Sequence, residues 1–338
     1  MNKTDQRGSD LLDGFDASVQ SKKVAFDSHQ LVECASCRRR NPPNRAECLY
    51  CGFGLEGEVM PAVELDFKFR RPNTGELGGV LLVSVPHDKQ DSPNLLSAAR
   101  LLSMDPKDLQ TILDASVPLP ICHIEGEKEA SSLQNLLEDA GVKCTMVSDE
   151  SLQANVPPVR LAGIRFLEKE LVFTSFNSHE QLVIPNDQIL LLVEGFISVS
   201  RVEQTEKRKG HQSHIQDESS AIFDDAILDI YTVNDATGFR VLPTGFDYSA
   251  LGNKKTLIAA ENLKELTRRL SSACTNSRTV SGFRSFRESL GRVWDLEVRR
   301  ESNGLRVTGF GKREIGSVLS TSNLEQFTKF SRLQRLLT

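Results

Sequence analysis

The stretch CASCRRRNPPNRAECLYC, residues 34–51, decides how the front of this chain folds. It holds two C-x-x-C pairs, Cys34 with Cys37 and Cys48 with Cys51, and ten residues separate the pairs. Each pair can present two thiolates to one tetrahedral metal ion, which is the spacing of a structural zinc site. A segment this short cannot bury a useful core, so we expect bound metal to supply its folding free energy.

The cysteine spacing leaves other interpretations open, because paired disulfides or a redox dithiol can use it too. Disulfides need an oxidising compartment, and the first ten residues, MNKTDQRGSD, lack the apolar core of a secretion signal. Four nearby thiolates close the coordination shell, whereas a catalytic zinc keeps one position open. The sequence therefore predicts a cytoplasmic protein with one structural Zn²⁺, bound by Cys34, Cys37, Cys48 and Cys51.

This stretch resembles the Ran-binding-protein type of zinc finger, as well as a short zinc ribbon. Asn41 lies four residues after Cys37 and seven before Cys48, as in that finger type. Val32 stands two positions before the first cysteine, where the family usually carries tryptophan. The resemblance implies the four metal ligands. The family's RNA or ubiquitin binding is not carried over, because the tryptophan is missing.

Four arginines lie between the two cysteine pairs: Arg38, Arg39, Arg40 and Arg45. Such residues can contact phosphates, which makes them candidate nucleic-acid contacts. Arginines beside four thiolates also offset the negative charge of the metal site. The aromatic side chains that accompany basic residues in single-strand binders are limited here to Tyr50 and Phe53. Both interpretations of the arginines stay open.

Length and composition are those of an ordinary soluble globular protein. The chain has 338 residues, of which 26% are charged and 39% hydrophobic, and this length has room for two or three domains. A formal net charge of −5 argues against a protein dedicated to coating nucleic acid, although local basic patches can still bind nucleic acid. The longest apolar run, ILLLVEGFISV, is far shorter than the ~20 residues that cross a bilayer, so we expect no membrane span.

The pattern of polar and apolar segments along the sequence predicts a multidomain α+β protein. The expected segments are a disordered tail at 1–30, the zinc ribbon at 31–55, a linker at 56–77, an α/β domain at 78–150, a β-rich domain at 158–275 and a C-terminal extension at 276–338. Within the extension we expect a helix and a strand around the only tryptophan, Trp294, and a terminal helix from Asn323.

Residues 78–150 have the clearest pattern of the chain. Apolar runs and helical spacings predict the order β-α-α-β-α-β, in the segments GVLLVSV, NLLSAARLLSM, PKDLQTILDAS, LPICHIEG, EASSLQNLLEDAG and VKCTMVS. In element order and helix length this segment resembles the C-terminal domain of the ribosomal stalk protein and the N-degron adaptor of the Clp protease. The resemblance implies a sandwich of helices on a sheet that acts as a protein-docking module.

Residues 158–275 are predicted to form several antiparallel strands and one helix, AAENLKELTRRLSSA. They resemble a pleckstrin-homology-like domain, and VIPNDQILLLVEGFI is similar to the strand-turn-strand of its bacterial members. The resemblance implies a fold but no particular ligand. The polar residues 204–220 are expected to form a mobile loop between two strands.

No catalytic constellation is recognisable in the sequence. It has no Walker loop, nucleophile elbow or H-E-x-x-H motif. His123 and Glu125 have the H-x-E spacing of zinc deaminases, but the C-x-x-C pairs lie upstream, so an exposed polar strand edge is expected there. His211 and His214 fall in the expected loop, and two histidines alone make a weak metal site.

These observations predict a non-enzymatic zinc-binding adaptor or regulator that acts through protein docking. The alternative is a nucleic-acid- or ribosome-associated zinc-finger factor. The sequence does not identify the protein partner.

Overall fold

A computed structural model describes most of the chain. The described residues are 31–34, 36–42, 45, 47–52, 67–72, 78–86, 93–209, 212–309 and 312–338, with the backbone alone described at 205–209, 212–218, 303–309 and 312–315. The tail expected at 1–30 and most of the linker expected at 56–77 lie outside the described residues. The described part has mixed α+β structure, as the sequence predicts. Contacts between Cα atoms divide the chain into two compact units, residues 1–66 and 67–338.

The first unit carries the cysteine pairs and a small two-stranded sheet. Strand β1 (Val32–Glu33) pairs antiparallel with β2 (Arg40–Asn41), so that Val32 lies opposite Asn41. This hairpin encloses the first C-x-x-C turn.

The second unit begins with the predicted β-α-α-β-α-β order. Its elements are β3 (Val80–Ser84), α1 (Leu95–Leu101), α2 (Pro106–Leu113), β4 (Pro120–Ile124), α3 (Glu127–Asp139) and β5 (Cys144–Ser148). The central strand β3 pairs antiparallel with both neighbours, in the order β4-β3-β5. Local signals set the helix ends: the Asp105 carboxylate accepts a hydrogen bond from the Lys107 amide at 2.8 Å, and Pro106 opens α2.

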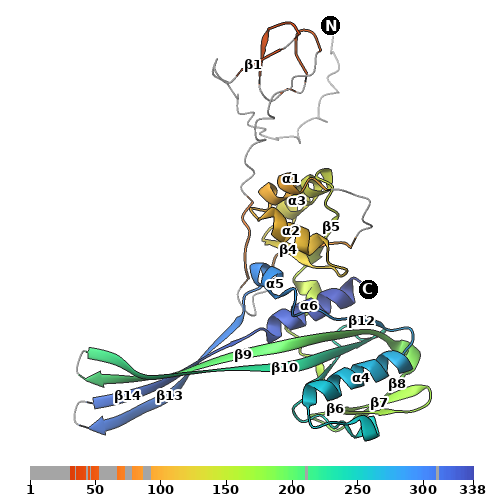
Figure 1. Cartoon of the computed structure of the whole chain (residues 1–338), viewed down its shortest axis with the longest axis vertical. Coiled ribbons are helices and arrows are strands. Elements are labelled where there is room, and N and C mark those ends of the chain that lie inside the picture. Colours follow the sequence, from red (N-terminus) through yellow and green to blue (C-terminus); the bar gives the residue numbers. More distant parts are fainter. Residues whose placement is uncertain are drawn as a thin grey trace, which may run out of the picture. The chain divides into compact units, whose positions relative to one another are not determined.

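The remaining strands form one large sheet. They are β6 (Val159–Phe166), β7 (Glu170–Ser175), β8 (Gln181–Pro185), β9 (Ile189–Lys209), β10 (Gln212–Thr232), β11 (Phe239–Val241), β12 (Arg278–Val280), β13 (Glu297–Gly309) and β14 (Lys312–Ser322). In the described part of the chain the order is β13-β14-β9-β10-β11-β6-β7-β8, with β12 beside β9 (Figure 1). Helices α4 (Ala259–Ala273), α5 (Arg287–Val293) and α6 (Leu324–Leu336) complete the unit. Short 3₁₀ helices lie at Glu150–Leu152, Asn186–Gln188 and Ser249–Lys254.

The large sheet separates two hydrophobic cores. Along β9 the side chains alternate, so Leu191 belongs to the core that contains Phe330 of α6, while Leu192 belongs to the core that contains Leu266 of α4. Figure 1 shows α6 and α4 on opposite sides of β9 and β10. Helix α6 packs very closely against the sheet at Gly195. A Cβ atom on this residue would lie 2.3 Å from the ring of Phe327 on α6, so only glycine fits there. The part of the sheet around Leu191 and Leu192 is therefore covered by a helix on each face.

The mobile loop expected at 204–220 is a wrong prediction. The structure continues both strands through this region, so that Lys209 on β9 lies opposite Gln212 on β10. Strand β14 pairs with the other edge of β9 over the same length, and Lys312 lies opposite Lys209. Backbone pairing on both sides of β9 satisfies its N–H and C=O groups, so a polar sequence can remain extended there without a hydrophobic face.

The predicted helix and strand around Trp294 and the terminal helix are confirmed, and these elements pack into the second unit. Strands β13 and β14 join the large sheet, and the Trp294 side chain is buried. Helix α6 also joins this sheet to the segment 78–150. Its Gln334 amide donates to the Pro118 carbonyl at 2.8 Å, and its Ser331 hydroxyl lies 2.8 Å from the Tyr231 hydroxyl on β10. The core on this side accordingly runs from β3 to α6 without a break.

The expectation that His123 lies at an exposed strand edge is wrong. His123 is buried on β4, and its Nε2 atom lies 2.8 Å from a carboxylate oxygen of Asp149, which is buried as well. The cysteines outside the first unit, Cys122, Cys144 and Cys274, are buried and free of disulfides. Among the described helices, none combines the length and apolar character needed to span a membrane.

Candidate metal centre

The structure brings the four predicted ligands together. The Sγ atoms of Cys34, Cys37, Cys48 and Cys51 all lie within 4.8 Å of one another. The sulfur of Cys34 is 3.6 Å from that of Cys51, and the sulfur of Cys37 is 3.5 Å from that of Cys48. Tetrahedral bonds of ~2.3 Å to one metal ion place sulfurs about 3.8 Å apart. The cluster therefore fits a single four-coordinate ion, and no disulfide joins these cysteines.

The two C-x-x-C turns have equivalent backbone geometry. The residue after each second cysteine, Arg38 in one turn and Gly52 in the other, has a left-handed backbone, with φ of 59° and 71°. Each of these residues donates its amide to the carbonyl of the first cysteine, to Cys34 at 2.8 Å and to Cys48 at 2.9 Å. Two matching knuckles thus present their thiols to one point.

Asn41 connects the two knuckles through its side chain. Its amide nitrogen donates to the Arg39 carbonyl at 2.9 Å and to the Cys48 sulfur at 3.4 Å. Its amide oxygen accepts a hydrogen bond from the Leu49 amide at 2.9 Å. Asn41 is fully buried, although most neighbouring residues are exposed. Sequence reasoning noted Asn41 as part of the finger pattern and did not assign it this role.

Hydrogen bonds also favour the thiolate form at Cys48. Burial raises the pKa of its thiol, but amide donors from Tyr50 and Cys51, with further hydrogen bonds from Cys37 and Asn41, lower it to about 6. Such donors stabilise a metal-bound thiolate as well as a free one. At Cys37 the Arg39 amide lowers the pKa, while burial and the other three cysteines raise it to about 12. The Cys37 thiol therefore keeps its proton at neutral pH in the metal-free chain, and metal binding must release that proton.

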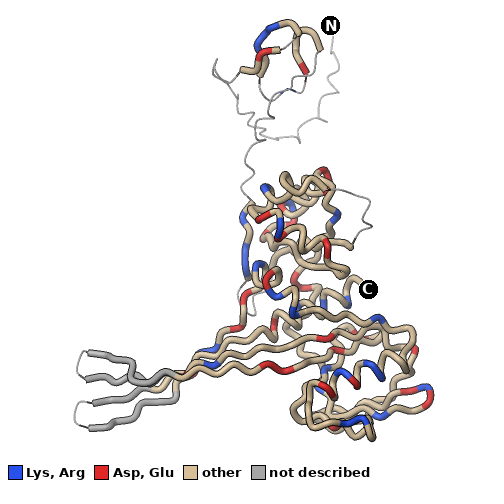
Figure 2. Tube along the Cα trace, viewed as in Figure 1, with Lys and Arg blue, Asp and Glu red and all other residues tan. Residues whose placement is uncertain are grey.

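The four arginines lie at the surface of this unit. Arg38, Arg39, Arg40 and Arg45 are all exposed, and Figure 2 shows the first three as one continuous basic stretch. The Arg39 guanidinium carbon lies 4.8 Å from the centre of the Tyr50 ring, and 56% of Tyr50 is exposed. The neighbouring Leu49 is 54% exposed. Phe53 lies outside the described residues.

The other histidines considered from the sequence form no comparable site. The described residues contain one group of three or more metal-binding side chains, and it is the four cysteines. The Nε2 atom of His123 contacts Asp149, while a carboxylate oxygen of Glu125, which directly follows β4, lies 3.4 Å from the Arg70 guanidinium. His211 lies outside the described residues, and only the backbone of His214 is described.

Comparison with protein-family models, with curated proteins and with solved structures finds no match to this chain. The interpretation of the metal centre therefore rests on its own geometry.

Proposed function

We propose that the first unit binds one structural Zn²⁺ and that the chain is a non-enzymatic adaptor. The observation that carries this proposal is the closed shell of four sulfurs, with Cys34, Cys37, Cys48 and Cys51 within 4.8 Å of one another. Four thiolates in tetrahedral geometry favour zinc or an iron–sulfur centre, and one mononuclear site of this size favours zinc. All four positions are filled by protein, which leaves no site for a substrate. We place the protein in the cytoplasm, because the ligands must be reduced thiols.

Protein docking is the activity that we assign to this adaptor. The zinc-bound unit would offer the exposed Leu49 and Tyr50 on a rigid knuckle. We keep the stalk-protein or Clp-adaptor likeness for 78–150 and the pleckstrin-homology likeness for 158–275 as proposals about fold. The first likeness supports docking, because the stalk-protein domain and the Clp adaptor are both docking modules, whereas the second implies no particular ligand.

A nucleic-acid- or ribosome-associated role is the second candidate. It is favoured by the Arg39–Tyr50 stack, since an exposed aromatic ring beside a guanidinium can stack on an unpaired base. Arg38, Arg40 and Arg45 would then contact phosphates.

Metal analysis tests the zinc proposal. Purified chain should contain about one zinc ion, and cobalt in its place should give intense tetrahedral and thiolate charge-transfer bands that small anions leave unchanged. Bands that shift with anions would reveal an open coordination position on the metal. Such a position would indicate a catalytic site and contradict the structural one. A chelator should unfold the first unit alone, because the cysteine segment has no other source of folding energy.

Crosslinking and salt titration separate the two roles. An adaptor should crosslink to the same host protein at low and at high ionic strength, and Cys48→Ser should abolish crosslinks from the first unit. A nucleic-acid factor should retard RNA in a gel, with an affinity that falls steeply as salt rises. Arg39→Ala should then weaken RNA binding and leave protein crosslinks unchanged.

A further inference from the structure

Strand β10 contains a stretch, residues 219–226, that is paired on one side only. Strand β9 pairs with β10 from Gln212 to Thr232, whereas β11 pairs with the other side of β10 only at Leu228–Ile230. Within the described part of the chain, the backbone of 219–226 has no partner on that other side. Figure 1 shows this part of β10 at the margin of the sheet, between α4 and the end of the hairpin that β9 and β10 form. We call residues 219–226 the β10 edge.

The β10 edge is a regular strand. Its pairing with β9 has no register shift between Asp217 and Tyr231. In such a strand every second residue directs its N–H and C=O groups toward the unpaired side, and a row of these groups is a template for another strand. Strand β13, at the end of the sheet, is less suitable, because a β-bulge between Ser302 and Leu305 interrupts it.

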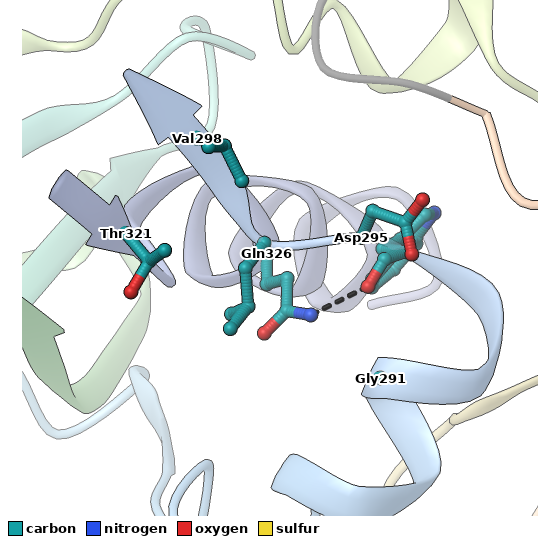
Figure 3. A pocket seen from close by; sticks show the side chains of 7 residues that line it. Gly291, Asp295, Val298, Thr321 and Gln326 are labelled. Carbon is teal, nitrogen blue, oxygen red and sulfur yellow. Dashed lines mark hydrogen bonds between the residues drawn. The ribbon is translucent and has the colours of Figure 1, made fainter. Parts of the chain in front are cut away.

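The start of β13 borders a hollow of about 630 Å³, lined by Trp294, Val298 and Gln326 among other residues (Figure 3). The indole Nε1 of Trp294 and the amide Oε1 of Gln326 have no hydrogen-bond partner in the described structure, but both atoms are buried. A ligand in the hollow would therefore contact neither atom without a rearrangement of the wall. The region does provide an exposed apolar side chain outside the β10 edge, because Val298 is 57% exposed.

The side chains of the β10 edge combine apolar and acidic character. Ile222 is 71% exposed and Phe223 is 56% exposed. Asp224 and Asp225 follow, and both are exposed as well. Asp224 lies 3.9 Å from Arg284, whereas Asp225 has no ion-pair partner among the residues described. Because successive residues of a strand face opposite sides of the sheet, each side of the edge has one exposed apolar residue and one carboxylate.

Charge indicates which kind of strand fits this edge. Residues 217–226, DESSAIFDDA, include four acidic residues and no basic residue. A second copy that paired here would bring the acidic residues of both copies onto one ladder, which is unfavourable. Lysine or arginine residues opposite the two aspartates would pair favourably with them, and apolar residues opposite Ile222 and Phe223 would cover their exposed surface.

We propose that the β10 edge binds an extended basic peptide segment of another protein as an added strand. The segment runs antiparallel to β10, which is the slightly more stable arrangement, and carries two basic residues followed by two apolar ones. In this order the basic residues lie opposite Asp225 and Asp224, and the apolar residues lie opposite Phe223 and Ile222. Main-chain pairing supplies affinity and the side chains supply specificity. This inference rests on the adaptor role proposed above and names the class of partner for the second unit.

Fluorescence anisotropy with a labelled octapeptide tests the edge on the full chain. The probe carries Lys-Lys-Val-Val among threonines, and matched peptides carry Glu-Glu in place of Lys-Lys or methyl groups on the backbone nitrogens. The lysine peptide should bind about tenfold more tightly than the glutamate peptide, because like charges replace opposite ones across the strands. Backbone methylation should abolish binding, because it removes the N–H donors. Equal affinity for the lysine and glutamate peptides, or no binding below about 1 mM, overturns the proposal.

Two charge reversals locate the binding. Asp225→Lys should weaken the lysine peptide about tenfold and strengthen the glutamate peptide, because the charge opposite the peptide is reversed. Glu168→Lys makes the same change of net charge at an exposed residue between β6 and β7, and it should alter neither affinity. Equal effects of the two variants would mean that net charge alone attracts the peptide, which overturns the assignment to β10.

Two further substitutions test the apolar contacts. Phe223→Thr should weaken the lysine peptide about threefold, whereas Val298→Thr, beside the hollow of Figure 3, should leave its affinity unchanged. The two side chains are similarly exposed, at 56% and 57%, and threonine favours strands, so both variants should fold. Wild-type affinity of Phe223→Thr would contradict the proposed register of the peptide on β10.

The result separates this inference from the zinc proposal. A Cys48→Ser chain that has lost its metal should still bind the lysine peptide, because the β10 edge lies wholly in residues 67–338. A chain that holds zinc but binds no peptide contradicts the β10 edge alone. A concentration-dependent dimer that Ile222→Asp dissociates, measured by sedimentation, assigns the edge to a second copy and contradicts the peptide proposal.

Discussion

The Asp229 carboxylate on β10 accepts two hydrogen bonds from Arg240 on β11, at 2.7 Å from Nε and 2.8 Å from Nη2. The two residues lie directly opposite each other in the sheet, and both are buried. Burial lowers the pKa of Arg240, but the charge and hydrogen bonds of Asp229 raise it overall. The same guanidinium donates to the Thr328 hydroxyl on α6 at 3.0 Å, so the pair fixes the terminal helix on the sheet.

Asp229→Ala should destabilise the second unit strongly. The substitution leaves the Arg240 guanidinium buried without its counter-charge, and breaking a buried ion pair in this way costs about 3–5 kcal/mol. Urea unfolding measures the loss. The double variant Asp229→Leu with Arg240→Met should recover much of it, because two apolar side chains need no partner. A double variant as unstable as Asp229→Ala would show that the geometry, and not the unpaired charge, is responsible.

Acid should remove the contribution of Glu265 on α4. Hydrogen bonds from Arg268 and then from Lys254 lower the pKa of this carboxyl to about 2. Because the pKa is lower in the folded chain, the stabilisation is present above the unfolded value of about 4.3 and is lost as the pH falls toward 2. Wild type should therefore melt above Glu265→Gln at pH 6, and the difference should shrink steadily below pH ~4.5.

The control for this acid effect removes the partner. In an Arg268→Gln background, Glu265→Gln should change the melting temperature less at pH 6, because only Lys254 remains to stabilise the carboxylate. A difference between wild type and Glu265→Gln that stays constant from pH 6 to pH 2 would contradict the ion-pair explanation.

Leu191→Asp should unfold the second unit or nearly so. The side chain is fully buried in the core that α6 shares with 78–150, and an unpaired carboxylate there costs several kcal/mol. Leu182→Asp on the edge strand β8 is the matched control, because that leucine is exposed and should change the free energy of unfolding little. Thermal unfolding by circular dichroism distinguishes the two. Near wild-type stability of Leu191→Asp would mean that the strand is not covered.

The sequence predicted best what depends on near neighbours. The ligand set follows from the spacing within residues 34–51, and the order of elements in 78–150 follows from apolar periodicity and from helix caps such as Asp105. The terminal helix after Asn323 was visible for the same reason. Each of these features is decided by residues within a few turns of one another.

Contacts between residues far apart in the chain could not be predicted from the sequence. His123 is buried because Asp149, 26 positions later, satisfies its imidazole. The strands through 204–220 are polar, and they extend because β14 pairs with β9 from more than 100 positions away in the chain. The unpaired atoms of Trp294 and Gln326 could not be foreseen either, since they depend on how α6 meets the start of β13. Composition and periodicity carry no information about such pairings.

Asn41→Ala should weaken metal binding while leaving all four ligands in place. The substitution removes the donor to the Cys48 sulfur and both hydrogen bonds that tie the knuckles together at Arg39 and Leu49. Groups that orient ligands in this way typically contribute about 10–100-fold in metal affinity. Competition with a chromophoric chelator measures the affinity, and cobalt bands report whether the site stays tetrahedral.

A matched substitution separates the loss of these hydrogen bonds from a general effect on the cysteine segment. Arg45→Ala changes an exposed residue between the cysteine pairs whose amide, and not its side chain, makes the hydrogen bond seen there, to the Pro42 carbonyl. Its metal affinity should equal that of wild type, with unchanged cobalt bands. Asn41→Ala should keep tetrahedral bands, because the four thiolates still define the geometry, but should release the metal at lower chelator concentration. If Asn41→Ala held the metal as tightly as Arg45→Ala, the knuckles would be pre-organised by the metal alone, and Asn41 would be a residue of the local fold without influence on the site.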